Sequence, residues 1–102
     1  MRKMIESNVM ILLKYMVVAK SKEGLIGYLL ELAREAGEEY YTEQAEKWRR
    51  LLSEFEERRI MGVLLGYAYD YENGKAYAIV AVDEPSMDAT LVKFIDIEEF
   101  LK

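Results

Sequence analysis

The dipeptide Asn73-Gly74 is the feature that most constrains how this chain can fold. It lies between two runs that are rich in β-branched and aromatic residues, Met61–Tyr71 and Lys75–Asp83. Asn-Gly readily adopts the two positive φ angles of a type I′ turn, which joins adjacent antiparallel strands through two residues. The sequence therefore predicts a β-hairpin that turns at Asn73-Gly74.

A two-residue loop also fixes the register of the hairpin, and with it the face that each side chain occupies. Tyr67, Tyr69 and Tyr71 then share one face of the sheet. Their expected partners across the hairpin are Val80 for Tyr67, Ala78 for Tyr69 and Ala76 for Tyr71. Large rings beside small or branched residues would form a row of ridges and hollows.

Hydrophobic periodicity and capping residues predict the remaining elements. We expect a strand over Val9–Ala19, a helix from a Ser21 cap to Ala36, a second helix from a Thr42 cap to about Arg59, a strand over Leu91–Ile95 and a short C-terminal helix capped by Asp96. The order β-α-α-β-β-β-α indicates an α+β fold in which a small, mainly antiparallel sheet packs against a helical hairpin. No linker or low-complexity tract divides the chain, so we expect residues 1–102 to form a single domain.

The composition argues against several classes of function. The chain contains no cysteine and no histidine, so it lacks thiolate ligands, a cysteine nucleophile and the side chain most used for proton transfer near neutral pH. A net charge of −5 disfavours a general nucleic-acid or anionic-membrane binder. We expect a cytoplasmic protein without a cofactor. Its bias toward Glu and Tyr is typical of proteins from hot environments, such as the orphan proteins of archaea and their viruses.

The tyrosine row is the leading candidate for a functional surface. Tyrosine is enriched in protein interfaces, where a rigid ring gives a large contact area at low entropic cost. The apolar arc of the first predicted helix is also broad, and Ile26 and Leu30 lie on it. We therefore hypothesise a non-enzymatic interaction module that binds a protein, a peptide or a second copy of itself through Tyr67, Tyr69 and Tyr71 or through the helix. The alternative is that the helical hairpin buries the tyrosine row as core.

Two other classes of function remain open. Asp83, Glu84 and Asp88 surround the only proline and could offer oxygen ligands to a divalent cation in a small carboxylate-dependent enzyme. Turn formation is the favoured explanation, because their spacing matches no known calcium loop. The second predicted helix carries candidate phosphate contacts for a weak nucleic-acid binder. These are Arg49, Arg50, Arg58 and Arg59, all interspersed with glutamates.

The element order also resembles the first half of the GNAT acetyltransferase fold, in which a strand, two helices and an antiparallel hairpin follow one another. Asn73-Gly74-Lys75 stands where that hairpin turns. The resemblance implies an acetyltransferase-like enzyme. The pyrophosphate-binding signature of the family, Arg/Gln-x-x-Gly-x-Gly/Ala, is missing here, and the residues after Val82 read Asp-Glu-Pro-Ser-Met-Asp. No residue role is carried over from that family.

Overall fold

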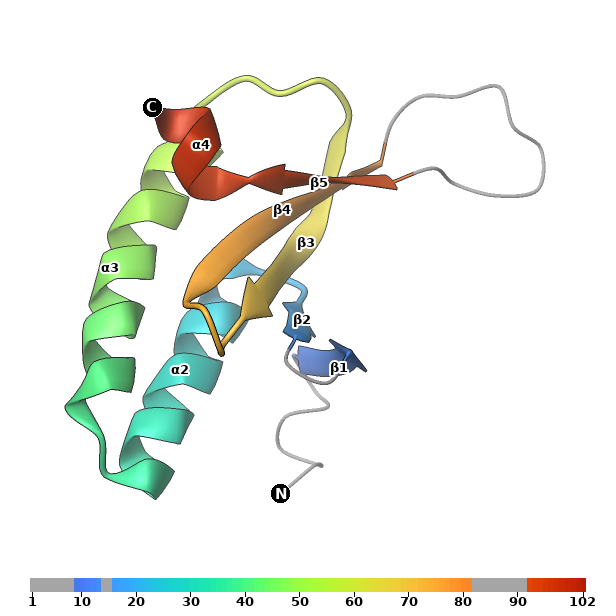
Figure 1. Ribbon diagram of the computed structural model, residues 1–102. Coiled ribbons are helices and arrows are strands. Elements are labelled where there is room, and N and C mark those ends of the chain that lie inside the picture. The colour runs from blue at the N-terminus through green and yellow to red at the C-terminus, as the bar shows by residue number, and fades with distance from the viewer. Residues whose placement is uncertain (1–8, 14–15, 82–91) are drawn as a thin grey trace.

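A computed structural model of the chain describes residues 9–13, 16–81 and 92–102 (Figure 1). The elements in chain order are β1 (Val9–Leu13), β2 (Met16–Ala19), α2 (Lys22–Ala36), α3 (Glu39–Glu56), β3 (Val63–Asp70), β4 (Lys75–Ala81), β5 (Val92–Asp96) and α4 (Ile97–Leu101). The five strands form one sheet in the order β1-β2-β3-β4-β5, and every neighbouring pair is antiparallel.

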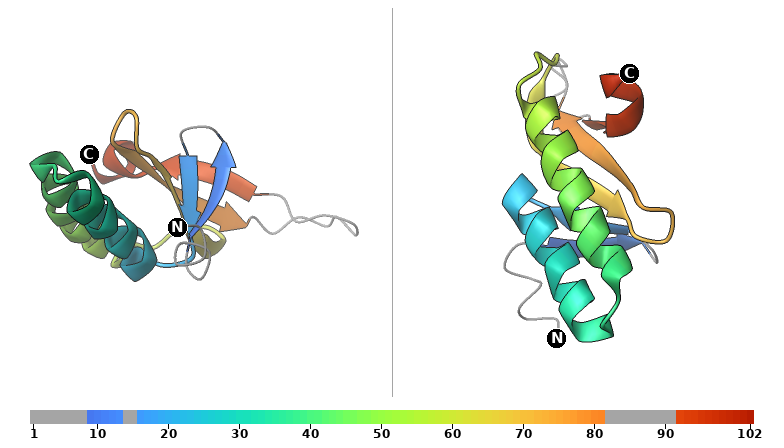
Figure 2. Two further views of the ribbon diagram at one scale, coloured as in Figure 1. Left: turned by 90° about the horizontal axis from the view of Figure 1, so that it is seen from below. Right: turned by 90° about the vertical axis from the view of Figure 1, so that its left-hand side faces the viewer.

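The helices α2 and α3 form an antiparallel hairpin that covers one face of the sheet (Figure 2). The short helix α4 also contributes to the core on that side, where Ile97 is fully buried. The predicted α+β class, with an antiparallel sheet against a helical hairpin, is confirmed. Among the described residues, no helix has the length and hydropathy that a membrane crossing requires.

Helix α2 begins and ends where the sequence predicts. The Ser21 side chain accepts a hydrogen bond from the Gly24 amide at 3.0 Å, which satisfies one of the free donors of the first turn. At the other end Gly37 has a φ of 67°, the left-handed conformation that glycine adopts without steric cost. Its amide donates to the Ala33 carbonyl at 2.8 Å.

The prediction for the second helix is wrong at its start. Helix α3 begins three residues before Thr42, at Glu39, and its N-cap Glu38 makes no side-chain capping bond. The early start lengthens the helix and places Tyr40 and Gln44 beside Gly74 at the tip of the β-hairpin. Thr42 thus lies within the helix, and its hydroxyl does not cap the helix.

The segment predicted as one strand over residues 9–19 forms two strands. β1 and β2 pair antiparallel, with Val9 opposite Ala19 and Ile11 opposite Val17. A long apolar run that is suited to a central strand is equally suited to two short strands that fold back on each other. β2 in turn pairs with β3, so this N-terminal hairpin extends the sheet beyond the tyrosine strand.

The hairpin at Asn73-Gly74 forms, but the predicted register is wrong by two residues. Asp70 pairs with Lys75, so the loop holds four residues, and only Gly74 in it has a positive φ. The two oxygens of the Asp70 carboxylate accept hydrogen bonds from the Glu72 amide, the Asn73 amide and the Asn73 side chain, and the Asp70 carbonyl accepts one from the Gly74 amide. This Asx-type loop competes with the type I′ turn and prevails.

The shift by an even number keeps Tyr67 and Tyr69 on the predicted face and gives them Ala78 and Ala76 as partners. Tyr71, by contrast, lies in the loop outside the paired strands. The row that forms therefore contains only two of the three predicted tyrosines. Tyr71 is half-buried and packs against the core.

A β-bulge at the start of β3 changes the faces of the residues before it. Leu64 pairs with Val80 and Gly66 with Ile79, so Leu65 is the additional residue. Leu64 therefore lies on the helix-covered face, where the uninterrupted alternation would have placed Val63. Gly66 is needed here because a Cβ atom would stand 2.5 Å from the Ala19 carbonyl oxygen of β2.

Candidate interaction surface

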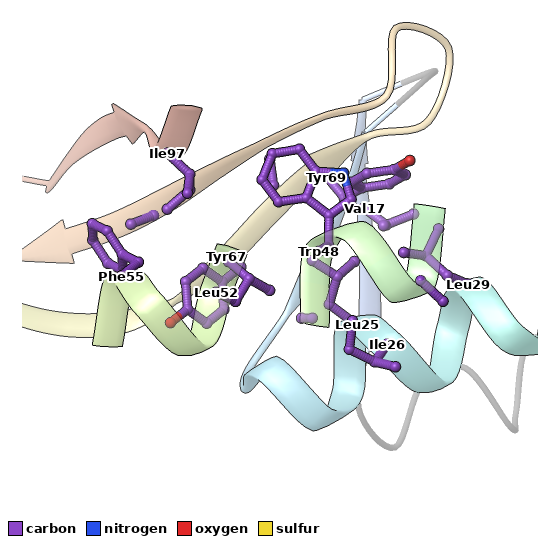
Figure 3. Close-up of a cluster of buried hydrophobic side chains, with 14 of the residues drawn as sticks. Val17, Leu25, Ile26, Leu29, Trp48, Leu52, Phe55, Tyr67, Tyr69 and Ile97 are labelled. Atoms are coloured by element: carbon purple, nitrogen blue, oxygen red, sulfur yellow. The ribbon is translucent and has the colours of Figure 1, made fainter. Parts of the chain in front are cut away.

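The two tyrosines of β3 are buried in the core. The rings of Tyr67 and Tyr69 lie between the sheet and the helical hairpin, among residues of α2, α3 and β2 (Figure 3). Both side chains are essentially inaccessible to solvent. Both rings are therefore part of the core, which was the alternative to a binding surface, and neither is accessible to a partner.

Their hydroxyl groups are satisfied by α3. Tyr67 donates to the Glu56 carboxylate at 2.7 Å, and Tyr69 donates to Gln44 Oε1, also at 2.7 Å. The same Gln44 oxygen accepts a hydrogen bond from Trp48 Nε1 at 3.0 Å. Burial raises the pKa of both tyrosines well above the usual range, and for Tyr67 the hydrogen bond to Glu56 adds to this effect. These hydroxyls stay protonated and lock the hairpin to the helix.

The two interaction residues predicted on the first helix, Ile26 and Leu30, differ in their exposure to solvent. Ile26 is buried in the core, whereas Leu30 is 41% exposed. Both line an open groove of about 470 Å³ along α2 and α3, whose rim includes Lys22 and Arg49. Lys22 donates to Ser53 at 3.1 Å and lies 3.6 Å from Glu56. Among the residues that line this groove, Leu30 is the only large apolar side chain with substantial exposure.

The four candidate arginines do not gather into a basic patch. All are exposed on α3 or just after it, and Arg58 lies 3.7 Å from Glu54 in an ion pair between successive helical turns. Arg49 lies on the rim of the groove along α2 and α3, whereas Arg50 lies on another groove, which Glu54 and Glu98 also line. Arginines that alternate with glutamates in this way are typical of a solvated helix face.

The candidate metal ligands Asp83, Glu84 and Asp88 lie outside the described residues. Within residues 16–81 and 92–102, no group of three or more carboxylates is arranged to hold a metal ion. Acidic side chains there pair with cations or face solvent, as in the Lys47–Glu98 ion pair at 3.0 Å between α3 and α4.

Several exposed apolar side chains lie on the sheet face opposite the helices, which we call the open face. Residues paired across a sheet point to the same side, so the register defines its rows. From one end to the other the rows are Val63–Ala81–Val92, Gly66–Ile79–Phe94, Val18–Ala68–Tyr77–Asp96 and Met16–Asp70–Lys75. None of the described helices lies over this face (Figure 2).

Exposure is greatest at the end of the open face formed by the first two rows. Val63 is 64% exposed, Phe94 is 47% exposed and Val92 is similarly open. Met61 and Leu65, which lie two residues from Val63 along the chain, are also exposed. Single exposed apolar residues are ordinary, but a contiguous patch on a soluble domain indicates a contact surface. Three of the seven exposed large apolar side chains among the described residues, Val63, Val92 and Phe94, belong to this end, which makes it the candidate interaction surface.

The opposite end of the open face is polar and internally neutralised. Lys75 Nζ lies 3.3 Å from Asp96 Oδ2, and Asp70 is occupied by the hairpin loop. The pair with Asp96 raises the pKa of Lys75. Burial tends to raise the pKa of Asp96, but hydrogen bonds from the Glu99 amide and from Lys75 outweigh it and lower the pKa. Both groups therefore stay charged and paired near neutral pH.

Sequence reasoning missed Val63, Val92 and Phe94. A signal for them existed in the alternation of β4, because Tyr77, Ile79 and Ala81 put apolar side chains on the face away from Ala76 and Ala78. The bulge at Leu65 hid Val63, since strict alternation had placed it on the covered face.

Three comparisons with known proteins found no relative. No family model matches the chain, and neither a curated protein nor a solved structure matches it. The function proposed below is therefore based on the geometry of this molecule alone.

Proposed function

We propose that this protein is a non-enzymatic interaction module and that the apolar end of the open face is its contact surface. The observation that carries the proposal is the concentration of exposed Val63, Val92 and Phe94 on one side of the sheet. Removing such side chains from water is the main source of affinity in protein association.

The chemistry of the chain supports a binding role. Cysteine and histidine are absent from the sequence, and the buried tyrosine hydroxyls serve as hydrogen-bond donors between β3 and α3. The open face combines exposed apolar residues with one neutralised ion pair, a pattern that suits a protein surface better than a charged ligand.

Site-specific photo-crosslinking tests this proposal in the cells that produce the protein. The photoreactive residue p-benzoylphenylalanine replaces Phe94 on the open face or, as the matched control, Tyr40 on α3. The two rings have similar exposures of 47% and 43%, but they belong to different surfaces. We expect irradiation to join Phe94→p-benzoylphenylalanine to a second polypeptide, while Tyr40→p-benzoylphenylalanine gives no adduct. Absence of any adduct at position 94, or an adduct at position 40 alone, contradicts the proposal.

A further inference from the structure

We infer that the partner on the open face is a second copy of this chain, stacked sheet against sheet around a two-fold axis. The inference rests on the proposed function and adds the identity of the partner. The arrangement would turn the open face of each copy into half of the core of a β-sandwich. Three features of the face favour a second copy over another occupant.

The first feature is the size of the face. Strands β2 to β5 hold four, eight, seven and five residues. At about six residues on average, with about 3.3 Å per residue and strands about 4.8 Å apart, they give a face of roughly 19 by 20 Å, or about 380 Å² in projection. Two such faces together give about 760 Å² in projection. The accessible area of side chains exceeds their projection, so the total approaches the roughly 1,200 Å² at the lower end of specific interfaces. A face of this size suits a reversible dimer.

The second feature is self-complementarity. A two-fold interface brings the same patch of each copy together, so any unpaired charge near its centre would meet its own like charge. The rows around Val63, Ile79 and Phe94 carry no charged side chain. The charged groups lie in the other two rows, where Lys75 pairs with Asp96 and the Asp70 carboxylate accepts hydrogen bonds from the hairpin loop. The patch therefore fits a copy of itself without repulsion.

The third feature is where the remaining charge lies. The chain has a net charge of −5, which by itself would keep two copies apart. The exposed glutamates of the helices, such as Glu23, Glu43 and Glu46, belong to the layer on the other side of the sheet. Sheets stacked about 10 Å apart place the two helix layers further from each other than the screening length of about 8 Å at physiological salt. A face-to-face dimer thus keeps its like charges screened.

The absence of cysteine in the chain makes a direct test possible. A single Val63→Cys substitution provides the only thiol for a spin label on the open face, and Glu46→Cys provides a control on the outer face of α3. Electron–electron distance measurements should give a short distance of about 25 Å or less at position 63, which follows from the sheet spacing and the length of the face. The distance at position 46 should be clearly longer. A shorter distance at position 46 than at position 63 overturns the inference.

Charge substitutions test the same face by molar mass. Light scattering after gel filtration should give twice the monomer mass for the unmodified chain at high micromolar concentration. Phe94→Lys should shift the dimer–monomer midpoint to at least tenfold higher concentration. Leu30→Lys, which adds the same charge at a side chain of similar exposure on α2, should leave it unchanged. Thermal melts followed by circular dichroism verify that each variant is folded. If Phe94→Lys does not fold, the spin-label distances test the inference in its place.

The outcomes separate this inference from the proposed function. A strictly monomeric protein, or a dimer disrupted by Leu30→Lys and unaffected by Phe94→Lys, overturns the inference. If the position 94 crosslink then contains a different polypeptide, the interaction module survives with another partner. If position 94 gives no adduct and the protein is monomeric, both proposals fail.

Discussion

At the scale of single residues, one side-chain amide oxygen accepts two hydrogen bonds inside the core. Gln44 Oε1 accepts from Tyr69 of β3 and from Trp48 one turn along α3. Both donors belong to fully buried side chains. A buried donor left without an acceptor costs about 1–3 kcal/mol, whereas removing a donor and leaving the acceptor otherwise satisfied costs less. The acceptor of Gln44 is therefore more important to these two hydrogen bonds than either donor is.

This asymmetry gives a quantitative prediction. Gln44→Leu leaves two buried donors unpaired and should lower the free energy of unfolding by about 2–4 kcal/mol. Tyr69→Phe removes one hydroxyl while Trp48 still donates to Gln44, and should cost about 1 kcal/mol. Urea unfolding followed by tryptophan fluorescence measures both values, since Trp48 is the only tryptophan. Equal losses in the two variants would show that the shared acceptor has no special role.

At the scale of the elements, the ends of α2 and α4 follow local chemistry, and the loop of the β-hairpin does not follow its strongest local signal. Ser21 caps α2, and the Asp96 carboxylate caps α4 by accepting from the Glu99 amide at 3.3 Å. Asn73-Gly74 predicted the presence of the hairpin correctly. The predicted turn type is wrong because the Asp70 carboxylate accepts hydrogen bonds from the loop amides. Gly74 in this loop also packs against Tyr40 and Gln44 of α3.

The stability of the protein should change in opposite directions when Gly27 within α2 and Gly37 at its C-cap are each replaced by alanine. Gly27 lies within the helix, and nothing stands within 4 Å of the position a Cβ atom would take. Gly27→Ala should therefore stabilise the protein by about 0.5–1 kcal/mol, because alanine loses less backbone entropy in a helix. Gly37 has a φ of 67° at the helix end, so Gly37→Ala should destabilise it by about 1 kcal/mol. Thermal unfolding of the pair measures the difference, and a shift in the same direction for both variants contradicts the argument.

At the scale of the whole molecule, the helices cover one face of a five-stranded sheet and leave its other face open. The burial of Tyr67 and Tyr69 links the hairpin to α3, so both tyrosines titrate only when this layer opens. Burial also raises the pKa of the half-buried Tyr28 to about 12. The stability of the entire core therefore depends on pH through these phenols.

The sign of this dependence follows from proton linkage. Unfolded tyrosine has a pKa of about 10, and the folded values of Tyr67, Tyr69 and Tyr28 are higher. Above pH 10 the unfolded state releases protons that the folded state retains, so the contribution of these phenols to stability is constant below about pH 10 and is lost as the pH rises further. Urea midpoints measured between pH 8 and pH 11.5 should decline from about pH 10 with more than one proton released per molecule. The Tyr67→Phe, Tyr69→Phe double variant should show a shallower decline; an unchanged slope in that variant would contradict the assignment.

The sequence by itself determined the α+β class, the ends of α2, the cap of α4 and the existence of the hairpin, because each depends on short-range periodicity or on side chains that bond to nearby amides. It also determined that the strands are apolar on both faces. Tertiary structure alone decided which of those faces the helices cover, since both were apolar enough to be buried. It placed Tyr67 and Tyr69 in the core and left Val63 and Phe94 exposed, through a bulge and a loop register that depend on contacts between segments far apart in the chain.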